Sequence, residues 1–163
     1  MYPAVRVANF FINRGLSEGE SITPLKVQKL VYFAHGWHLA LYGQPLIDEE
    51  IQAWKYGPVI PSLYHRLKGL GNNPIEEPVG EFSGGYSTRE VVKEVEEKDR
   101  PFLDFVWKLY GKIPALQLSA LTHVSNSPWD RVLEENGGYT TRNLPINNEW
   151  IKEYFVHQFQ PNG

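Results

Sequence analysis

One stretch of the sequence has the hydrophobic pattern of a long helix that is buried on more than one side. Over residues 24–42, the positions of one helical face recur every three or four residues, and they hold Val27, Leu30, Val31, Ala34, Trp37, His38 and Leu41. The opposite side also carries apolar residues, namely Leu25, Phe33 and Leu39. Thr23 can cap this helix, Pro24 suits its first position, and Gly43 follows its end. We therefore expect the helix at the centre of the fold, with Leu30 and Leu41 in the core.

Weaker amphipathic patterns predict several further helices. The expected ranges are residues 4–14, 61–68, 100–110, 114–124 and 128–136, followed by a C-terminal helix that holds Trp150 and Phe159. Asp99 and Ser127 are expected to cap the helices that follow them, because a side-chain oxygen there can accept from a free backbone N–H. Gly15 is expected to end the first helix.

The remaining segments predict a small amount of strand and a long loop. Residues 45–56 alternate partly between apolar and polar side chains, which predicts a short strand pair. Residues 75–86 are rich in Pro, Gly and Ser, so we expect a loop. Residues 87–95 fit a capped helix or a strand equally well. The predicted fold class is mainly α with a small β element (α+β).

Length and composition favour a single compact helical domain over residues 1–163, built around helix 24–42. A chain of 163 residues buries roughly 70% of the surface that its unfolded form exposes. The absence of cysteine excludes disulfides and thiolate metal sites, and it agrees with a reducing, cytoplasmic location. The sequence holds neither a signal-peptide pattern at its start nor the run of about 20 apolar residues that crosses a bilayer.

The charge pattern does not favour nucleic-acid binding. The formal net charge is −3, and acidic and basic residues are mixed along the chain. A nucleic-acid-binding protein needs a basic face, whereas the nearest candidates are the short pairs Lys26 with Lys29 and Arg66 with Lys68. A nucleic-acid-binding regulator is therefore kept only as an alternative.

Two histidines are the strongest candidates for chemistry. His35 and His38 are three residues apart on the central helix, so both imidazoles could reach one metal ion if an acid of residues 48–50 folds nearby. This gives a metal-dependent hydrolase as an alternative function, although packed, singly bonded histidines explain the same pattern better. Patterns typical of serine hydrolases, phosphate loops and zinc proteases are absent. We expect no catalytic role and no cofactor.

A cluster of aromatic residues lies beside a proline corner. Gly57-Pro58 is expected to form a rigid stop that holds Trp54 and Tyr56 in one orientation, because proline fixes φ and lacks an N–H. If both aromatic rings point inward, Pro58 and Val59 become the exposed features. Such a rigid aromatic segment suits contact with a partner more than catalysis.

A second aromatic corner is predicted between two helices. His123 can bond a free carbonyl at the end of one helix while Trp129 packs below it, or the corner can form part of a binding surface. The candidate partner-binding residues are therefore Trp54, Lys55, Tyr56, Pro58, Val59, His123 and Trp129.

Three motifs together resemble the SocA-like Panacea antitoxin domain. They are TPLKVQKLVYFAHGW at residues 23–37, AWKYGPV at residues 53–59, and LTH at residues 121–123 with PW at 128–129. Their order and spacing cover residues 5 to about 133, which leaves 134–163 as a C-terminal helical extension. The resemblance implies a mostly helical domain, common in bacteria and phages and found also in phage-associated proteins. In antitoxins it neutralises a co-encoded, cognate protein toxin by contact, without catalysis.

Overall fold

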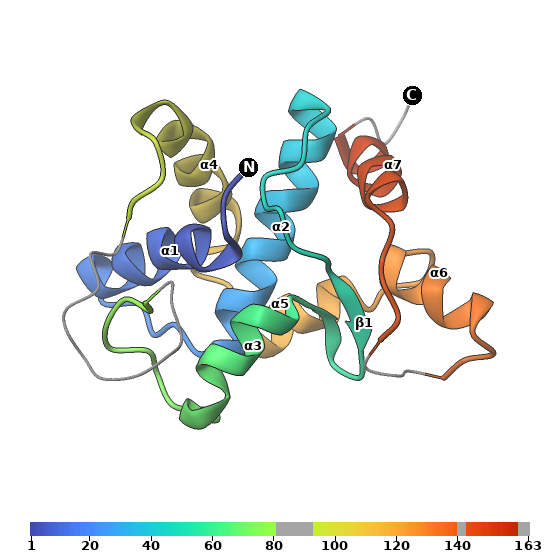
Figure 1. Ribbon diagram of the computed structural model, residues 1–163, viewed down its shortest axis with the longest axis horizontal. Helices are drawn as coiled ribbons and strands as arrows, with labels where there is room; N and C mark the ends of the chain where they lie inside the picture. Colours follow the sequence, from blue (N-terminus) through green and yellow to red (C-terminus); the bar gives the residue numbers. More distant parts are fainter. Residues whose placement is uncertain (81–92, 140–142, 160–163) are drawn as a thin grey trace.

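The central element of the fold is helix α2, Pro24–Tyr42, as Figure 1 shows. The computed structural model describes residues 1–80, 93–139 and 143–159. In these ranges it contains, besides α2, helices α1 (Ala4–Glu18), α3 (Pro61–Leu67), α4 (Arg100–Tyr110), α5 (Ala115–Thr122), α6 (Pro128–Glu135) and α7 (Asn148–Phe159), the 3-10 turns η1 (Lys68–Leu70) and η2 (Glu97–Asp99), and strands β1 (Gln52–Trp54) and β2 (Gly57–Val59). The two strands form one antiparallel sheet. The predicted fold class, mainly α with a small β element, is confirmed.

Helix α2 is buried all round over its middle turns, as its sequence pattern predicted. It contacts α1, α3, α4, α5, α7 and β2, and every residue from 26 to 36 is buried. The prediction for Leu41 was wrong, because this side chain is 40% exposed. The last turn is covered on one side only, where Leu39 is buried and Tyr42 packs against Phe102 of α4.

Helix α7 packs directly on α2, so the predicted C-terminal extension contributes to the core. Phe155 of α7 is 1% exposed, and its ring meets Tyr32, Phe33 and Trp37 at centroid distances of 5.3–6.1 Å. Gly36 makes this close approach possible, since a Cβ there would lie 2.2 Å from the Phe155 ring. The two helices thus pack closely where the Phe155 ring of α7 lies against Gly36 of α2.

Two predicted helix ends differ from those in the structure, each for its own reason. Helix α1 continues past Gly15 to Glu18 and ends at Gly19, whose φ of 71° suits a helix C-terminus. Gly15 instead lies where a Cβ would come within 2.4 Å of Ile22, so it serves close packing. Helix α5 ends at Thr122 and not at Val124, because the chain turns at His123.

Two of the three predicted N-caps are side-chain caps. Thr23 accepts a hydrogen bond from the Lys26 backbone N–H at 3.3 Å and opens α2, as expected. Ser127 accepts a hydrogen bond from the Asp130 backbone N–H at 3.2 Å and opens α6, as expected. Asp99 precedes α4 but makes no cap, because its carboxylate accepts from the Tyr2 hydroxyl. That bond ties the N-terminus of the chain to the start of α4.

The predicted loop after α3 lies partly outside the described residues, as does most of the ambiguous segment 87–95. In the described part of the loop after α3, the backbone of Val79 is bonded to the buried side-chain amide of Asn9 on α1. Asn9 Nδ2 donates to the Val79 carbonyl at 2.8 Å, and the Val79 N–H donates to Asn9 Oδ1 at 2.7 Å. Within the ranges that the structure describes, every helix is too short or too polar to span a membrane.

His35 joins α2 to two other parts of the fold. It is 1% exposed, its Nε2 donates to Asn148 Oδ1 of α7 at 2.9 Å, and its Nδ1 accepts from the Ile47 N–H at 3.4 Å. Both bonds require the neutral ring with its proton on Nε2. Burial lowers the pKa of His35 to about 4.

This burial predicts a loss of stability in mild acid. The unfolded chain takes up a proton on His35 near pH 6.5, whereas the folded chain does so only near pH 4. Lowering the pH through this window therefore favours unfolding, by up to about 1.4 kcal/mol per pH unit from this residue. Urea unfolding from pH 7.5 to pH 4.5 should show a shallower decline for His35→Gln than for wild type. His65→Gln, which replaces an exposed imidazole, is the matched control and should follow wild type; equal slopes for all three would contradict the assignment.

The difference in burial between two leucines of α2 gives a second prediction. Leu30 is fully buried, so Leu30→Ala should lower the free energy of unfolding by about 2–5 kcal/mol through lost contacts and a residual cavity. Leu41→Ala, at a 40% exposed position, should cost less than about 1 kcal/mol. Chemical denaturation of the two variants measures both values, and similar losses would show that α2 is packed differently from this description.

Candidate functional site

The β1–β2 hairpin places its turn at Lys55 and Tyr56. Ala53 pairs with Pro58, and Trp54 pairs with Gly57. The predicted corner at Gly57-Pro58 was therefore wrong, because both residues belong to β2. Gly57 has φ 109°, a backbone conformation that side chains disfavour.

Three side chains from three helices hold this hairpin by its backbone carbonyls. The donors lie on α6, α5 and α2: Trp129 Nε1 bonds the Trp54 oxygen at 2.6 Å, Ser119 Oγ bonds the Tyr56 oxygen at 3.0 Å, and Lys29 Nζ bonds the Pro58 oxygen at 2.9 Å. All three are hydrogen bonds across more than 25 residues of sequence. The turn is thus fixed from behind by the helical core.

His123 and Trp129 meet beneath the turn, as the sequence predicted. Their rings lie edge to face with centroids 4.4 Å apart. His123 Nδ1 donates to the Ser119 carbonyl near the end of α5 at 2.6 Å, and its Nε2 lies 3.4 Å from the Lys55 oxygen. The expected bond from His123 to a carbonyl at the helix end is present, and the Thr122 hydroxyl donates to the same oxygen at 2.6 Å.

Lys29 is an unusual member of this arrangement because its side chain is completely buried. Its relative exposure is 0%, and the acceptor that faces it is the neutral Pro58 carbonyl. Burial lowers the pKa of Lys29 to about 7. The sequence had grouped Lys29 with Lys26 as surface charges, whereas the structure places both among the buried polar residues.

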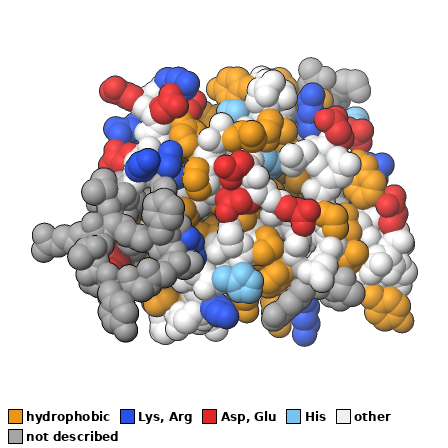
Figure 2. Space-filling model, viewed as in Figure 1, with side chains coloured by type: hydrophobic (Ala, Val, Ile, Leu, Met, Phe, Trp, Pro, Cys, Tyr) orange, Lys and Arg blue, Asp and Glu red, His pale blue; other side chains and the backbone are white. Residues whose placement is uncertain are grey.

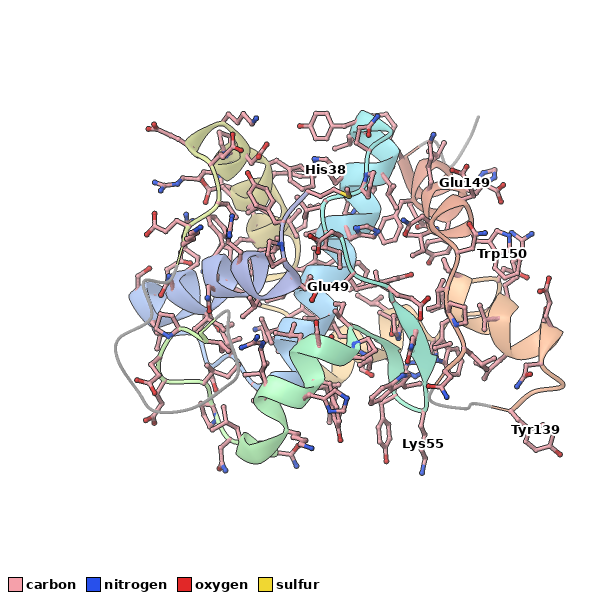
Figure 3. All side chains as sticks on the ribbon, in the orientation of Figure 1. His38, Glu49, Lys55, Tyr139, Glu149 and Trp150 are labelled. Carbon is pink, nitrogen blue, oxygen red and sulfur yellow. The ribbon has the colours of Figure 1, made fainter. Side chains whose placement is uncertain are left out.

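The hairpin exposes its turn and buries its second strand. Tyr56 is 65% exposed, and Lys55 projects from the turn away from the body of the protein (Figure 3). The Lys55 ammonium lies 5.4 Å from the centre of the Tyr56 ring. Pro58 and Val59 were expected to be exposed if both aromatic rings pointed inward; Tyr56 points outward instead, and Pro58 and Val59 are buried. The inward-facing residues differ from the prediction because the turn lies two residues earlier.

A pocket of about 530 Å³ opens beside the exposed turn. Its walls come from the first turns of α2, from α3 and η1, from the two residues after η1, and from four residues of the hairpin. The contribution of Tyr64 and Lys68 was missed in the sequence, although their spacing of four residues puts them on one helical face. The candidate residues thus divide: Trp54, Lys55, Tyr56 and Val59 line the pocket, whereas Pro58, His123 and Trp129 support it from behind.

The residues proposed for a metal site are used elsewhere in the fold. Both ring nitrogens of His35 are bonded within the protein, and His38 Nδ1 lies 2.6 Å from the Gln44 carbonyl. The Glu49 carboxylate accepts from the Ala4 N–H and from the Ser62 hydroxyl. Among the described residues, no group of three or more His, Asp or Glu side chains could hold a metal ion.

The surface shown in Figure 2 carries mixed charges. Lys and Arg side chains appear on this face singly or in small groups, with Asp and Glu between them. Several charges are paired, for example Arg14 with Asp104 and Arg131 with Glu153. The described residues of this face therefore do not form the continuous basic area on which a nucleic-acid backbone binds.

The packing at Gly57 predicts a strong effect of a single added methyl group. A Cβ at this residue would lie 2.6 Å from Thr122 Oγ1 and 3.0 Å from Lys29 Nζ, and φ is positive. Gly57→Ala should lower the free energy of unfolding by about 1–3 kcal/mol from backbone strain alone. Gly69→Ala is the control, since its Cβ would meet nothing within 4 Å, and it should change stability by less than about 0.5 kcal/mol. Equal stability of the two variants in urea would refute this description of the hairpin.

Comparison with known proteins identifies the family. The profile of the family described as "Antitoxin SocA-like, Panacea domain" matches residues 27–130, which include the hairpin and its three side-chain donors. Antitoxin SocA of Caulobacter vibrioides is 32% identical to this chain over 158 residues, covering 93% of the chain and 81% of the relative. No solved structure matches the chain significantly. The resemblance noted in the three motifs is confirmed, and the chain belongs to the SocA-like antitoxin family, whose defining unit is the Panacea domain.

Proposed function

We propose that this protein is a cytoplasmic antitoxin that binds a toxin encoded beside it and neutralises that toxin by direct contact, without a catalytic step. Membership of the SocA-like antitoxin family supports an antitoxin role. The hairpin turn is the main support for the location of the contact surface. Its backbone is bonded to side chains of three helices, while Lys55 and Tyr56 stay exposed. Neutralisation by contact consumes one antitoxin for each toxin.

A turn held in this way suits binding for a thermodynamic reason. A flexible loop loses conformational entropy when a partner orders it, whereas a fixed loop has already lost that entropy on folding. Tyrosine is among the residues that contribute most to protein interfaces, because its ring covers a large area with few rotatable bonds. Tyr56 combines this chemistry with 65% exposure on a fixed backbone.

The other candidate residues have two distinct roles in this proposal. Trp54, which is half-buried, and Val59, which is buried, line the pocket beside Tyr56. His123 and Trp129 act indirectly, because their polar atoms face the hairpin backbone or the end of α5. Substitutions at these two residues are therefore expected to change binding through the position of the turn.

A tyrosine substitution tests the proposal. Tyr56→Ala should weaken the complex with the co-encoded toxin about 30-fold, which corresponds to about 2 kcal/mol. Tyr139→Ala is the matched control, because Tyr139 is 74% exposed and follows α6, away from Lys55 (Figure 3). Isothermal titration calorimetry gives both affinities, and growth of cells that co-express the toxin reports neutralisation. Urea midpoints equal to wild type would show that both variants remain folded.

Two results would count against the proposal in different ways. If the co-encoded protein is harmless without this chain and forms no complex with it, the antitoxin function is wrong. If a neutralising complex forms and Tyr56→Ala binds as tightly as Tyr139→Ala, the function stands and the hairpin turn is not the contact surface.

A further inference from the structure

The pocket beside the hairpin turn differs in charge from the chain as a whole. The protein carries a formal net charge of −3. The pocket, in contrast, is lined by Lys29, Lys55 and Lys68, and none of its lining residues in the described part of the chain is Asp or Glu. Lys55 and Lys68 are exposed, while Lys29 lies buried at the base of the hairpin. Two exposed lysines thus lie at the rim of one pocket in a protein whose net charge is negative.

The walls of the same pocket are largely aromatic and aliphatic. Trp54 and Tyr64 meet edge to face with ring centroids 4.8 Å apart, and Tyr56, Leu25 and Leu67 add further apolar surface. A volume of about 530 Å³ lies within the range of pockets that enclose most of a small ligand. It is therefore large enough for a bulky side chain that enters from a partner protein.

Building on the proposed function, we infer that this pocket binds an acidic segment of the toxin, with one apolar or aromatic side chain inside it and neighbouring carboxylates against Lys55 and Lys68. The apolar walls bury the side chain that enters the pocket, and the two lysines at the rim complement the negative charge of the neighbouring carboxylates. Rim charges act mainly on association rate and partner choice, whereas a buried apolar side chain contributes most to affinity. The two parts of the pocket therefore have separate effects that can be measured separately.

The charge pattern favours a protein segment over a nucleic acid as the occupant. A polyanion gains affinity from many phosphate contacts along a basic path, and the lysines of this pocket form a single small group. A short acidic stretch needs only one or two such contacts. If an RNA homopolymer such as poly(U) competes with the toxin for this pocket, the inference is wrong.

Carbodiimide cross-linking of the complex tests the contact directly. This reagent joins a lysine amine to a carboxylate by an amide bond with loss of water, so it reports only on pairs in contact. Mass spectrometry of the wild-type complex should identify links from Lys55 or Lys68 to Asp or Glu of the toxin. Lys108, an exposed lysine on α4, should give no such link.

Charge reversal tests whether the contact contributes to binding. The double variant Lys55→Glu with Lys68→Glu should lower affinity about 10-fold or more, mainly through slower association, and should reduce the salt dependence of binding. Lys108→Glu reverses one exposed lysine on another surface and should change affinity by less than about threefold. Replacing the cross-linked toxin acid by lysine should restore the affinity of the double variant.

The outcomes separate this inference from the function on which it rests. If a neutralising complex forms, but its cross-links lie elsewhere and the double variant binds like Lys108→Glu, the acidic-segment inference is wrong and the antitoxin function stands. If poly(U) displaces the toxin from the pocket, the inference is also wrong. If no complex forms at all, the proposed function itself fails.

Discussion

The arrangement of this protein depends on hydrogen bonds from helix side chains to the backbone of a very short hairpin. Strands of three residues each cannot hold a hairpin by themselves in water. Here Lys29, Ser119 and Trp129 donate to three of its carbonyl oxygens. Each such bond contributes only about 0.5–1.5 kcal/mol net, but a buried carbonyl without a partner would cost more. The hairpin is therefore stable only as part of the complete helical core.

Helix α2 shows how one element serves both the core and the surface. Its apolar residues are buried against five other helices, and its buried polar residues fix extended segments. Gln28 donates to the Ile60 carbonyl at 3.1 Å and accepts from the Ile60 N–H at 2.9 Å, next to the bond from Lys29 to Pro58. Two consecutive residues of α2 thus set the path of the chain from β2 into α3. A functional surface built in this way is as rigid as the core beneath it.

Features that depend on local spacing could be predicted from the sequence. The position of α2, the cap at Ser127 and the contact between His123 and Trp129 all follow from neighbouring residues, and the structure has them as expected. The turn of the hairpin could not be placed in this way. Its position is fixed by Ser119 and Trp129, which lie more than 60 residues further along the chain. A proline beside a glycine was therefore read as a corner although both belong to a strand.

Contacts between residues far apart in the sequence also explain why single residues were wrongly predicted and why only part of the pocket was recognised. Lys29 was considered with Lys26 as a short basic pair, but it is fully buried. Gly15 was expected to end the first helix, but it packs against Ile22, which lies beyond the end of that helix. The pocket draws on α2, the hairpin and α3, so its existence depends on how three separate segments fold together. The aromatic residues of the hairpin were recognised from their local sequence; Tyr64 and Lys68 were not.

Hydrogen–deuterium exchange over residues 52–60, in the free protein and in its complex with the co-encoded toxin, tests the central claim most directly. The account predicts slow exchange of the hairpin amides already in the free protein, because the helices fix the hairpin, and further slowing around Lys55 and Tyr56 when the toxin binds. Exchange as fast as in an exposed loop in the free protein, or protection in the complex confined to other surfaces, would contradict it.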